Sequence, residues 1–356
     1  MARERKTVGR PKTQLDANRE SNIREALPAN VKTTSALRRI PLGRPLHYVQ
    51  APGVEGDVCG FQLVEKSPPI LVESVTGRMQ TLVPGDVFLG TPGSRESNIM
   101  LVGGVPKDGL IPGAAYWVIA ESGVVGELIT RTPLAKRFLG EVTYLGAVID
   151  AGGQTLTLQD FAVPAVARFK DHGAPLSLIV GTGPEVGKTT AGLGLLRTFL
   201  AKGHTTVIVL KATGTSSFAE IANYQDYGAA QVFDCVDFGL PTTYPSERKD
   251  MQRVFDRALD TCLAMPADAV VIECGGDMLA ANIPVFLKRL KRRRSRAKVV
   301  LAAADPLGAF GGTQMLRDIG LPANLITGPC TDTPASQHRT QSLCDTPAMN
   351  MFRRES

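Results

Sequence analysis

The sequence is notable first for patterns that it lacks. Its six cysteines (Cys59, Cys235, Cys262, Cys274, Cys330 and Cys344) form no Cys-x-x-Cys pair, which argues against a zinc ribbon and a dense disulfide framework and favours a reducing compartment. The four histidines are far apart in sequence, so no local histidine metal site is indicated. The longest apolar runs are too short to span a bilayer, and the N-terminus has no apolar signal-peptide core. We therefore expect a cytoplasmic protein with no membrane partner.

Aromatic residues are also scarce, at 6% of the 356 residues, and none lies within the two basic segments. One segment is residues 1–44 and the other is "LKRLKRRRSRAK" at 287–298, and the net charge is +6. Basic runs attract phosphates, nucleic acid or anionic membrane, but they also occur as solvated tails and helix faces. Without aromatics, neither run indicates a surface on which bases stack.

The N-terminal half changes character near residue 45. Residues 1–44 are polar and basic, and we expect a mostly disordered arm with a short helix around 22–27. Residues 45–165 contain short β-rich runs separated by Gly and Pro, such as "VCGFQLV", "DVFLG" and "AYWVIA". Short strands at even spacing predict a small all-β domain, either a barrel or a sandwich.

The C-terminal half has the pattern of an α/β domain. After a predicted linker at 166–175, apolar runs such as "LSLIV", "TTVIVL", "DAVVIEC" and "KVVLAAA" alternate with helical stretches at 188–202, 217–228, 246–264, 282–295 and 309–319. Doubly buried strands alternating with helices predict a parallel sheet with helices on both faces. We place this domain at 176–335 and expect an irregular tail at 336–356.

The stretch "LSLIVGTGPEVGKTT" at 176–190 carries the strongest functional signal. A strand leads into a glycine-rich loop, and a lysine opens the helix that follows, which is the pattern of a phosphate-binding loop (P-loop, Walker A motif). Backbone N–H groups of such a loop bind anions, the lysine reaches the β- and γ-phosphates, and the next hydroxyl binds Mg²⁺. The predicted nucleotide-binding residues are Gly181, Thr182, Gly183, Pro184, Glu185, Val186, Gly187, Lys188, Thr189 and Thr190.

Charged residues at the ends of neighbouring strands are the next candidates. Glu273 ends a predicted strand, and a carboxylate there points into the ligand crevice of an open parallel sheet, so we predict that it binds Mg²⁺ with Thr189. Lys211 ends another strand and would place a second cation near the γ-phosphate. Asp234 and Asp237 either contact substrate or belong to a turn, and Asp277 is a weaker carboxylate candidate.

The loop resembles that of dethiobiotin synthetase and its relatives in the SIMIBI class of P-loop NTPases, which carry GTxxEVGKT. "VIVLKATG" with Lys211 and "VVIECGG" with Glu273 are similar to two further motifs of that family. The resemblance covers about residues 176–328 and implies that Asp226 is a metal ligand. Lys-Ala replaces the family's Lys-Pro, "ECGGD" replaces "EGAGG", and the β-rich domain has no counterpart there. The chain also resembles an uncharacterised DUF1611-type group of P-loop proteins.

These observations predict an enzyme that uses ATP and Mg²⁺ and hydrolyses or transfers the γ-phosphate, with Lys188, Lys211 and Glu273 as catalytic residues. The family resemblance implies activation of a small carboxylate or carbamate. One alternative is a nucleotide-dependent switch or maturation factor that acts on a protein partner. Another is a polynucleotide 5′-hydroxyl kinase, because some such kinases also place a β-domain before a P-loop domain. The basic arm fits this alternative, and "KRLKRRRSR" would serve as a lid. The substrate stays unidentified, and a homodimer is possible.

Overall fold

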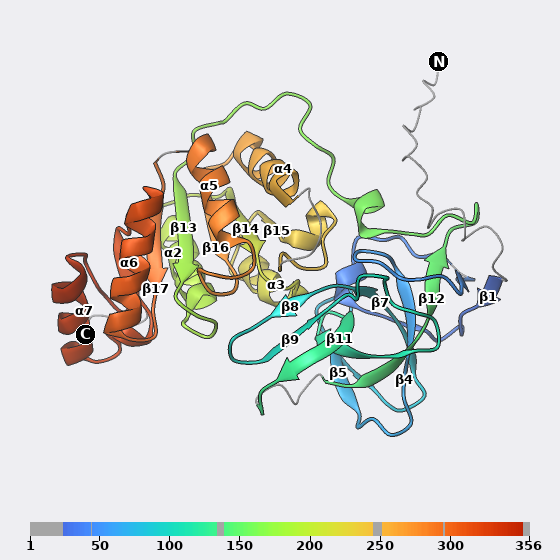
Figure 1. Ribbon diagram of the computed structural model, residues 1–356. Coiled ribbons are helices and arrows are strands. Elements are labelled where there is room, and N and C mark those ends of the chain that lie inside the picture. Colours follow the sequence, from blue (N-terminus) through green and yellow to red (C-terminus); the bar gives the residue numbers. More distant parts are fainter. Residues whose placement is uncertain (1–23, 44, 134–138, 245–250, 295, 352–356) are drawn as a thin grey trace, which may run out of the picture.

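The computed structural model describes residues 24–43, 45–133, 139–244, 251–294 and 296–351. Two parts lie side by side: a β-rich part (residues 24–163) and an α/β part (residues 176–351), with the connecting chain passing over one end of both (Figure 1). No helix among the described residues is both long and apolar enough to cross a bilayer. All six cysteines are buried free thiols.

The α/β part is built on a six-stranded parallel sheet. Its strands follow the order β15 (Gln231–Phe233), β14 (Val207–Thr213), β16 (Ala269–Cys274), β13 (Leu176–Gly181), β17 (Lys298–Ala302) and β18 (Leu325–Thr327). The helices are α2 (Lys188–Ala201), α3 (Phe218–Asp226), α4 (Met251–Ala264), α5 (Ile283–Arg293), α6 (Pro306–Ile319) and α7 (Pro334–Cys344), with short 3₁₀ turns η4 (Cys235–Phe238) and η5 (Pro329–Thr331). The predicted parallel sheet is therefore present.

Alternate residues of each strand pack against opposite helical layers. Leu178 and Ile272 belong to the core shared with α4, α5 and α6, whereas Ile179 and Val271 pack with α2 and Tyr224 of α3. Strands covered on both faces need apolar residues at every position, which explains their unbroken hydrophobic runs. The carboxyl ends of these strands form the edge at which the P-loop lies.

The β-rich part holds a ten-stranded sheet and a separate pair of strands. The ten strands are β1 (Arg24–Ala26), β2 (Lys32–Thr33), β3 (His47–Val49), β4 (Cys59–Leu63), β7 (Val87–Pro92), β8 (Arg95–Glu96), β9 (Leu101–Gly104), β10 (Ala115–Ala120), β11 (Val124–Arg131) and β12 (Glu141–Ile149). The pair is β5 (Ile70–Glu73) and β6 (Met79–Leu82), and the 3₁₀ turns are η2 (Ser35–Leu37) and η3 (Leu158–Phe161).

Five strands of this sheet pair in a closed ring. Strand β12 pairs with β4, β4 with β7, β7 with β11, β11 with β10, and β10 again with β12. Phe61, Phe88 and Tyr144 pack together in the core that these strands enclose. A closed ring of pairings with a filled interior favours the barrel over the sandwich.

The two chain ends differ from the expectations for them. Residues 24–43 were expected in a disordered arm, but Leu27 and Leu37 are buried against the β-rich part, and the predicted helix around 22–27 is replaced over its described residues by strand β1. Helix α7 (Pro334–Cys344) includes residues 336–344 of the segment expected to be irregular. Pro at the first helical position and the Thr333 cap explain this helix, whose weak apolar periodicity concealed it.

A buried ion-pair cluster joins the two parts. Arg38, next to η2, donates from Nη2 to Asp234 Oδ1 and to Asp237 Oδ2, both at 2.7 Å. Burial alone would lower the pKa of Arg38, but the two carboxylates raise it above its ordinary value. Asp234 also caps η4 by accepting from the Val236 N–H at 2.8 Å. The two aspartates thus belong to a turn and an internal contact, which leaves no observation in favour of substrate binding by them.

We expect Arg38→Ala to lower the free energy of unfolding by about 3–5 kcal/mol, because it leaves two buried carboxylates without their main counter-charge. Urea denaturation measures the change. Arg39→Ala is the matched control: its side chain is 35% exposed and contacts Asp237 at 3.1 Å, so its loss should cost less than about 1 kcal/mol. Equal effects of the two substitutions would contradict this assignment.

Candidate functional site

The P-loop connects β13 to α2. Glycine at 187 has a left-handed backbone with φ of 85°, and Glu185 has φ of 59°, so the loop turns its N–H groups inward before the helix starts at Lys188. A Cβ at Gly181 would lie 2.7 Å from Lys188 Cδ. Glycine at this position therefore leaves room for the Lys188 side chain along the loop. The unpaired N–H groups in the first turn of α2 lie at the same edge of the sheet and suit an anion.

Lys188 is a buried cation held by the loop itself. Its side chain is largely buried, and Nζ donates to the carbonyl oxygen of Gly183 at 2.7 Å. Burial lowers the pKa of Lys188, with a further decrease from Lys211, while Glu273 acts in the opposite direction. Because burial disfavours the charged form of Lys188, a nearby negative charge stabilises its ammonium group, and a bound phosphate would supply that charge.

Glu273 lies directly beside the P-loop. Strand β16 runs between β13 and β14, and Glu273 is paired in register with Ile179 on one side and Lys211 on the other. Its Oε1 accepts from the Thr189 hydroxyl at 2.9 Å, and its Oε2 accepts from the Tyr224 hydroxyl at 2.6 Å. Burial first, and then the nearby carboxylate, raises the pKa of Tyr224 well above its ordinary value, so the phenol stays a hydrogen-bond donor.

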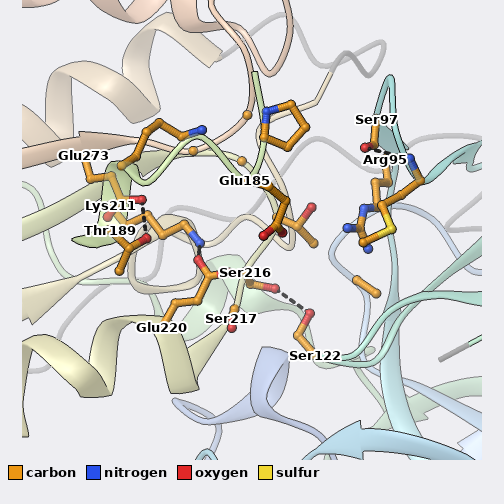
Figure 2. Close-up of a pocket in the computed structure, with 18 of the residues that line it drawn as sticks. Arg95, Ser97, Ser122, Glu185, Thr189, Lys211, Ser216, Ser217, Glu220 and Glu273 are labelled. Atoms are coloured by element: carbon orange, nitrogen blue, oxygen red, sulfur yellow. Dashed lines mark hydrogen bonds and ion pairs between the residues drawn. The ribbon is translucent and has the colours of Figure 1, made fainter. Parts of the chain in front are cut away.

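Lys211 adds a second buried cation at the same edge. It forms an ion pair with Glu220 of α3, whose side chain is about half exposed. A Cβ at Gly275 would lie 3.1 Å from Lys211 Cε and 2.5 Å from the carbonyl oxygen of Thr213, so this glycine makes room for the lysine and the backbone beside it. Figure 2 shows Lys211 and Glu273 close together, with the Thr189–Glu273 and Lys211–Glu220 contacts dashed.

These residues suit Mg²⁺ and a polyphosphate. The Thr189 hydroxyl and the Glu273 carboxylate are hard oxygen donors that already lie within hydrogen-bond distance of each other. Asp226, predicted as a further metal ligand, is exposed at the last residue of α3 and is not among the residues that line the cavity described next. Asp277 accepts from the N–H groups of Leu279 and Ala280, at 2.9 and 3.1 Å, and so shapes a turn.

One cavity of about 590 Å³ spans the P-loop and the β-rich part (Figure 2). From the predicted site it is lined by Pro184, Glu185, Gly187, Lys188, Thr189, Thr190, Lys211 and Glu273, whereas Gly181, Thr182, Gly183 and Val186 are not among its lining residues. The β-rich part contributes Arg95, Ser97, Ile99, Met100, Glu121 and Ser122. Ser122 and Ser216 are joined across the boundary by a hydrogen bond of 2.9 Å. Both parts therefore shape the volume beside the phosphate cradle.

Two residues of α3 were missed by the sequence reasoning. Tyr224 and Glu220 contact Glu273 and Lys211, yet both lie in a short helix that carries no motif. The one local signal is a glycine in α2: a Cβ at Gly192 would lie 2.0 Å from the Tyr224 hydroxyl oxygen. A glycine inside an otherwise good helix indicates a close neighbour, although it does not identify that neighbour.

No protein-family model and no curated protein matches the chain. Among solved structures, the signal recognition particle 54 kDa protein of Aeropyrum pernix, in complex with GDP, is 16% identical with a TM-score of 0.34 over 51% of this chain and 42% of its own. The receptor FtsY of Elizabethkingia anophelis, in complex with GDP, is 15% identical with a TM-score of 0.37 over 52% of this chain and 58% of its own. FtsY of Thermotoga maritima is 18% identical with a TM-score of 0.35 over 54% of this chain and 66% of its own.

The matched regions thus cover less than two thirds of each of these three structures. The resemblance to dethiobiotin synthetase rests on the motif residues alone. Similarity at this level assigns no ligand and no reaction to the chain. Its function has to be inferred from the residues that meet at the cavity.

We expect Gly192→Ala to destabilise the protein by about 1–3 kcal/mol, because the new methyl group overlaps the Tyr224 hydroxyl. That value is the net effect, because the cost of the overlap outweighs the gain of about 1 kcal/mol that alanine brings to a helix interior. Gly194→Ala is the control in the same helix, since its nearest contact, Met351 Cε at 3.4 Å, leaves ordinary space. Thermal unfolding should show Gly194→Ala unchanged or stabilised, and a stabilised Gly192→Ala would contradict the close contact.

Proposed function

We propose that the chain binds ATP with Mg²⁺ at this cavity and hydrolyses or transfers the γ-phosphate. The observation that carries the proposal is the convergence of Lys188, Thr189, Lys211 and Glu273 on a single cavity, from the first turn of α2 and the ends of strands β14 and β16. Two buried cations suit a polyphosphate, and the hydroxyl–carboxylate pair suits its metal ion. The resemblance of the loop to that of dethiobiotin synthetase supports ATP as the nucleotide.

The residues then have separate roles. Lys188 and the N–H groups of the loop bind the β- and γ-phosphates, and Lys211 lies where charge accumulates on the transferred phosphoryl group. Mg²⁺, when bound, supplies neutralisation of charge on the phosphate oxygens. The bond from the γ-phosphorus to the bridging oxygen breaks, a bond to the acceptor oxygen forms, and ADP leaves with the electron pair. Tyr224 holds the Glu273 carboxylate in place throughout.

The acceptor would bind on the side of the cavity that the β-rich part closes. Hydroxyl groups of Ser97 and Ser122 line that side, and Met100 and Ile99 add apolar surface. Ser216 of the α/β part lines the cavity at the boundary, where it is hydrogen-bonded to Ser122. Such a wall offers hydrogen-bonding groups to a polar small molecule. A small carboxylate or carbamate, as in the family that the loop resembles, would suit these donors.

The alternatives have less support from the cavity. A polynucleotide kinase would use the second basic segment on nucleic acid. Arg289, Arg293 and Arg294 form ion pairs with Asp256, Asp260 and Asp171, which reduces the charge available for that role. A nucleotide-dependent switch would use the same cradle and would differ in showing slow hydrolysis that a protein partner accelerates. Turnover with small carboxylates distinguishes the enzyme from the switch.

ATP with Mg²⁺ should stabilise the protein against heat, by about 2.7 kcal/mol at a hundredfold excess over the dissociation constant. Lys188→Ala should remove most of this stabilisation and abolish turnover, because the inward N–H groups then meet the phosphates without their cation. Thermal shift and calorimetry, each with ATP and with GTP, provide the measurements. A wild-type protein that responds to neither nucleotide at millimolar concentration would disprove the proposed function.

Lys211→Ala should act differently, by lowering kcat with little change in nucleotide affinity. Lys211 lies on β14, which β16 separates from the P-loop strand β13, so we expect its effect mainly in the transition state. Loss of one such charged donor typically costs about 3–4 kcal/mol, or a hundred- to thousandfold in rate. Single-turnover kinetics and the Kd for ATP separate the two lysines, and a variant within a fewfold of wild-type kcat would remove Lys211 from the mechanism.

A further inference from the structure

A carboxylate of the β-rich part caps a helix of the α/β part. Glu73, the last residue of β5, is buried, and its Oε2 accepts from the Phe218 N–H at 2.7 Å while its Oε1 accepts from the Ala219 N–H at 2.7 Å. The Ser217 hydroxyl donates to the same Oε1 at 3.4 Å. Ser35 of η2 also donates to the carboxylate and so fixes it from the other side.

Helix α3 depends on this outside cap. The first N–H groups of any helix have no partner within the helix, and a carboxylate there also interacts favourably with the helix dipole. Ser217 stands at the N-cap position but makes no side-chain cap hydrogen bond. With nine residues, α3 is too short to be stable alone, so its placement depends on its ends and its buried face.

The capped helix holds two groups of the proposed site. Glu220 pairs with Lys211, and Tyr224, one turn later on the same helix, donates to Glu273. A shift of α3 along its axis would move both contacts together, because the residues lie four positions apart. Arg38 packs over the Phe218 ring with its Cζ 5.3 Å from the ring centroid, which adds a second contact from the β-rich part at the same helix end.

We propose that Glu73 is a positioning residue for phosphoryl transfer: through α3, the β-rich part fixes Lys211 and Glu273 in their working places. The inference rests on the proposed function, because it assigns roles at the same site. It gives the β-rich part an effect on the rate in addition to its contribution to the cavity wall. This route reaches the proposed Mg²⁺ ligand Glu273 through Tyr224, and it reaches Thr189 through Glu273. Binding of ATP without Mg²⁺ depends instead on Lys188 and the N–H groups of the loop, so we expect that affinity to be independent of Glu73.

The test is Glu73→Gln, which keeps the shape of the side chain but removes its charge and one acceptor oxygen. We expect kcat to fall by about tenfold or more, since small displacements of reacting groups are costly, while the Kd for ATP measured without Mg²⁺, which depends on Lys188 and the loop, stays within about twofold of wild type. Asp268→Asn is the matched control. Its carboxylate accepts from the N–H groups of Thr205 and Thr206, at 2.7 and 2.8 Å, at the amino end of the sheet, and its kcat should not change.

A double-mutant cycle with Tyr224→Phe separates positioning from general destabilisation. If Glu73 acts through α3, the two substitutions together should lower kcat by clearly less than the product of their separate effects. Independent, multiplicative effects would overturn the inference, as would a Glu73→Gln kcat equal to that of Asp268→Asn. Should Glu73→Gln fail to fold, Ser35→Ala, which removes only the hydroxyl donor, should show the same fall in kcat at unchanged Kd, and an unchanged kcat would overturn the inference.

The two proposals fail in different ways. If wild-type protein turns over ATP and Lys188→Ala does not, while Glu73→Gln retains full kcat, the positioning role is wrong and the proposed function stands. If wild-type protein neither binds nor hydrolyses a nucleotide with Mg²⁺, the proposed function fails and the role of Glu73 fails with it.

Discussion

Three charged side chains are buried at one edge of the parallel sheet, and much of the surrounding structure follows from the need to provide them with partners. An unpaired charge in the interior is costly, so Lys188 is bound by a loop carbonyl, Lys211 by Glu220, and Glu273 by two hydroxyl groups. These partners come from the loop, from α3 and from α2. The arrangement of charge therefore fixes how the two helices lie against the sheet as well as the chemistry of the site.

The same constraint explains three glycines that are far apart in the chain. Gly181 makes room for the Lys188 side chain, Gly275 for Lys211, and Gly192 for the Tyr224 hydroxyl that reaches Glu273. None of these three positions has the left-handed backbone that usually explains a glycine. They are small because a charged or hydrogen-bonding side chain passes close by, so each is a consequence of the buried charges.

Sequence reasoning was most successful where one stretch of chain determines its own structure. The apolar runs predicted the strands of the parallel sheet, and "GKTT" predicted a helix that begins at Lys188, because both signals are local. The capping of α3 by Glu73 joins residues 145 positions apart, and no local pattern records such a contact. The ordering of residues 24–43 was missed for the same reason, since Leu27 and Leu37 have few apolar neighbours in sequence and find them only in the folded β-rich part.

The second basic segment shows how a charge run acquires its meaning from a neighbouring helix. Asp256 and Asp260 lie four residues apart on α4, and Arg289 and Arg293 lie four residues apart on α5, so each pair occupies one helix face. The helices pack side by side, and Arg289 pairs with Asp256 while Arg293 bridges Asp256 and Asp260. Much of the positive charge is thus used to hold α5 on α4. A run of cations favours a nucleic-acid surface only where the adjacent helix lacks acids at matching spacing.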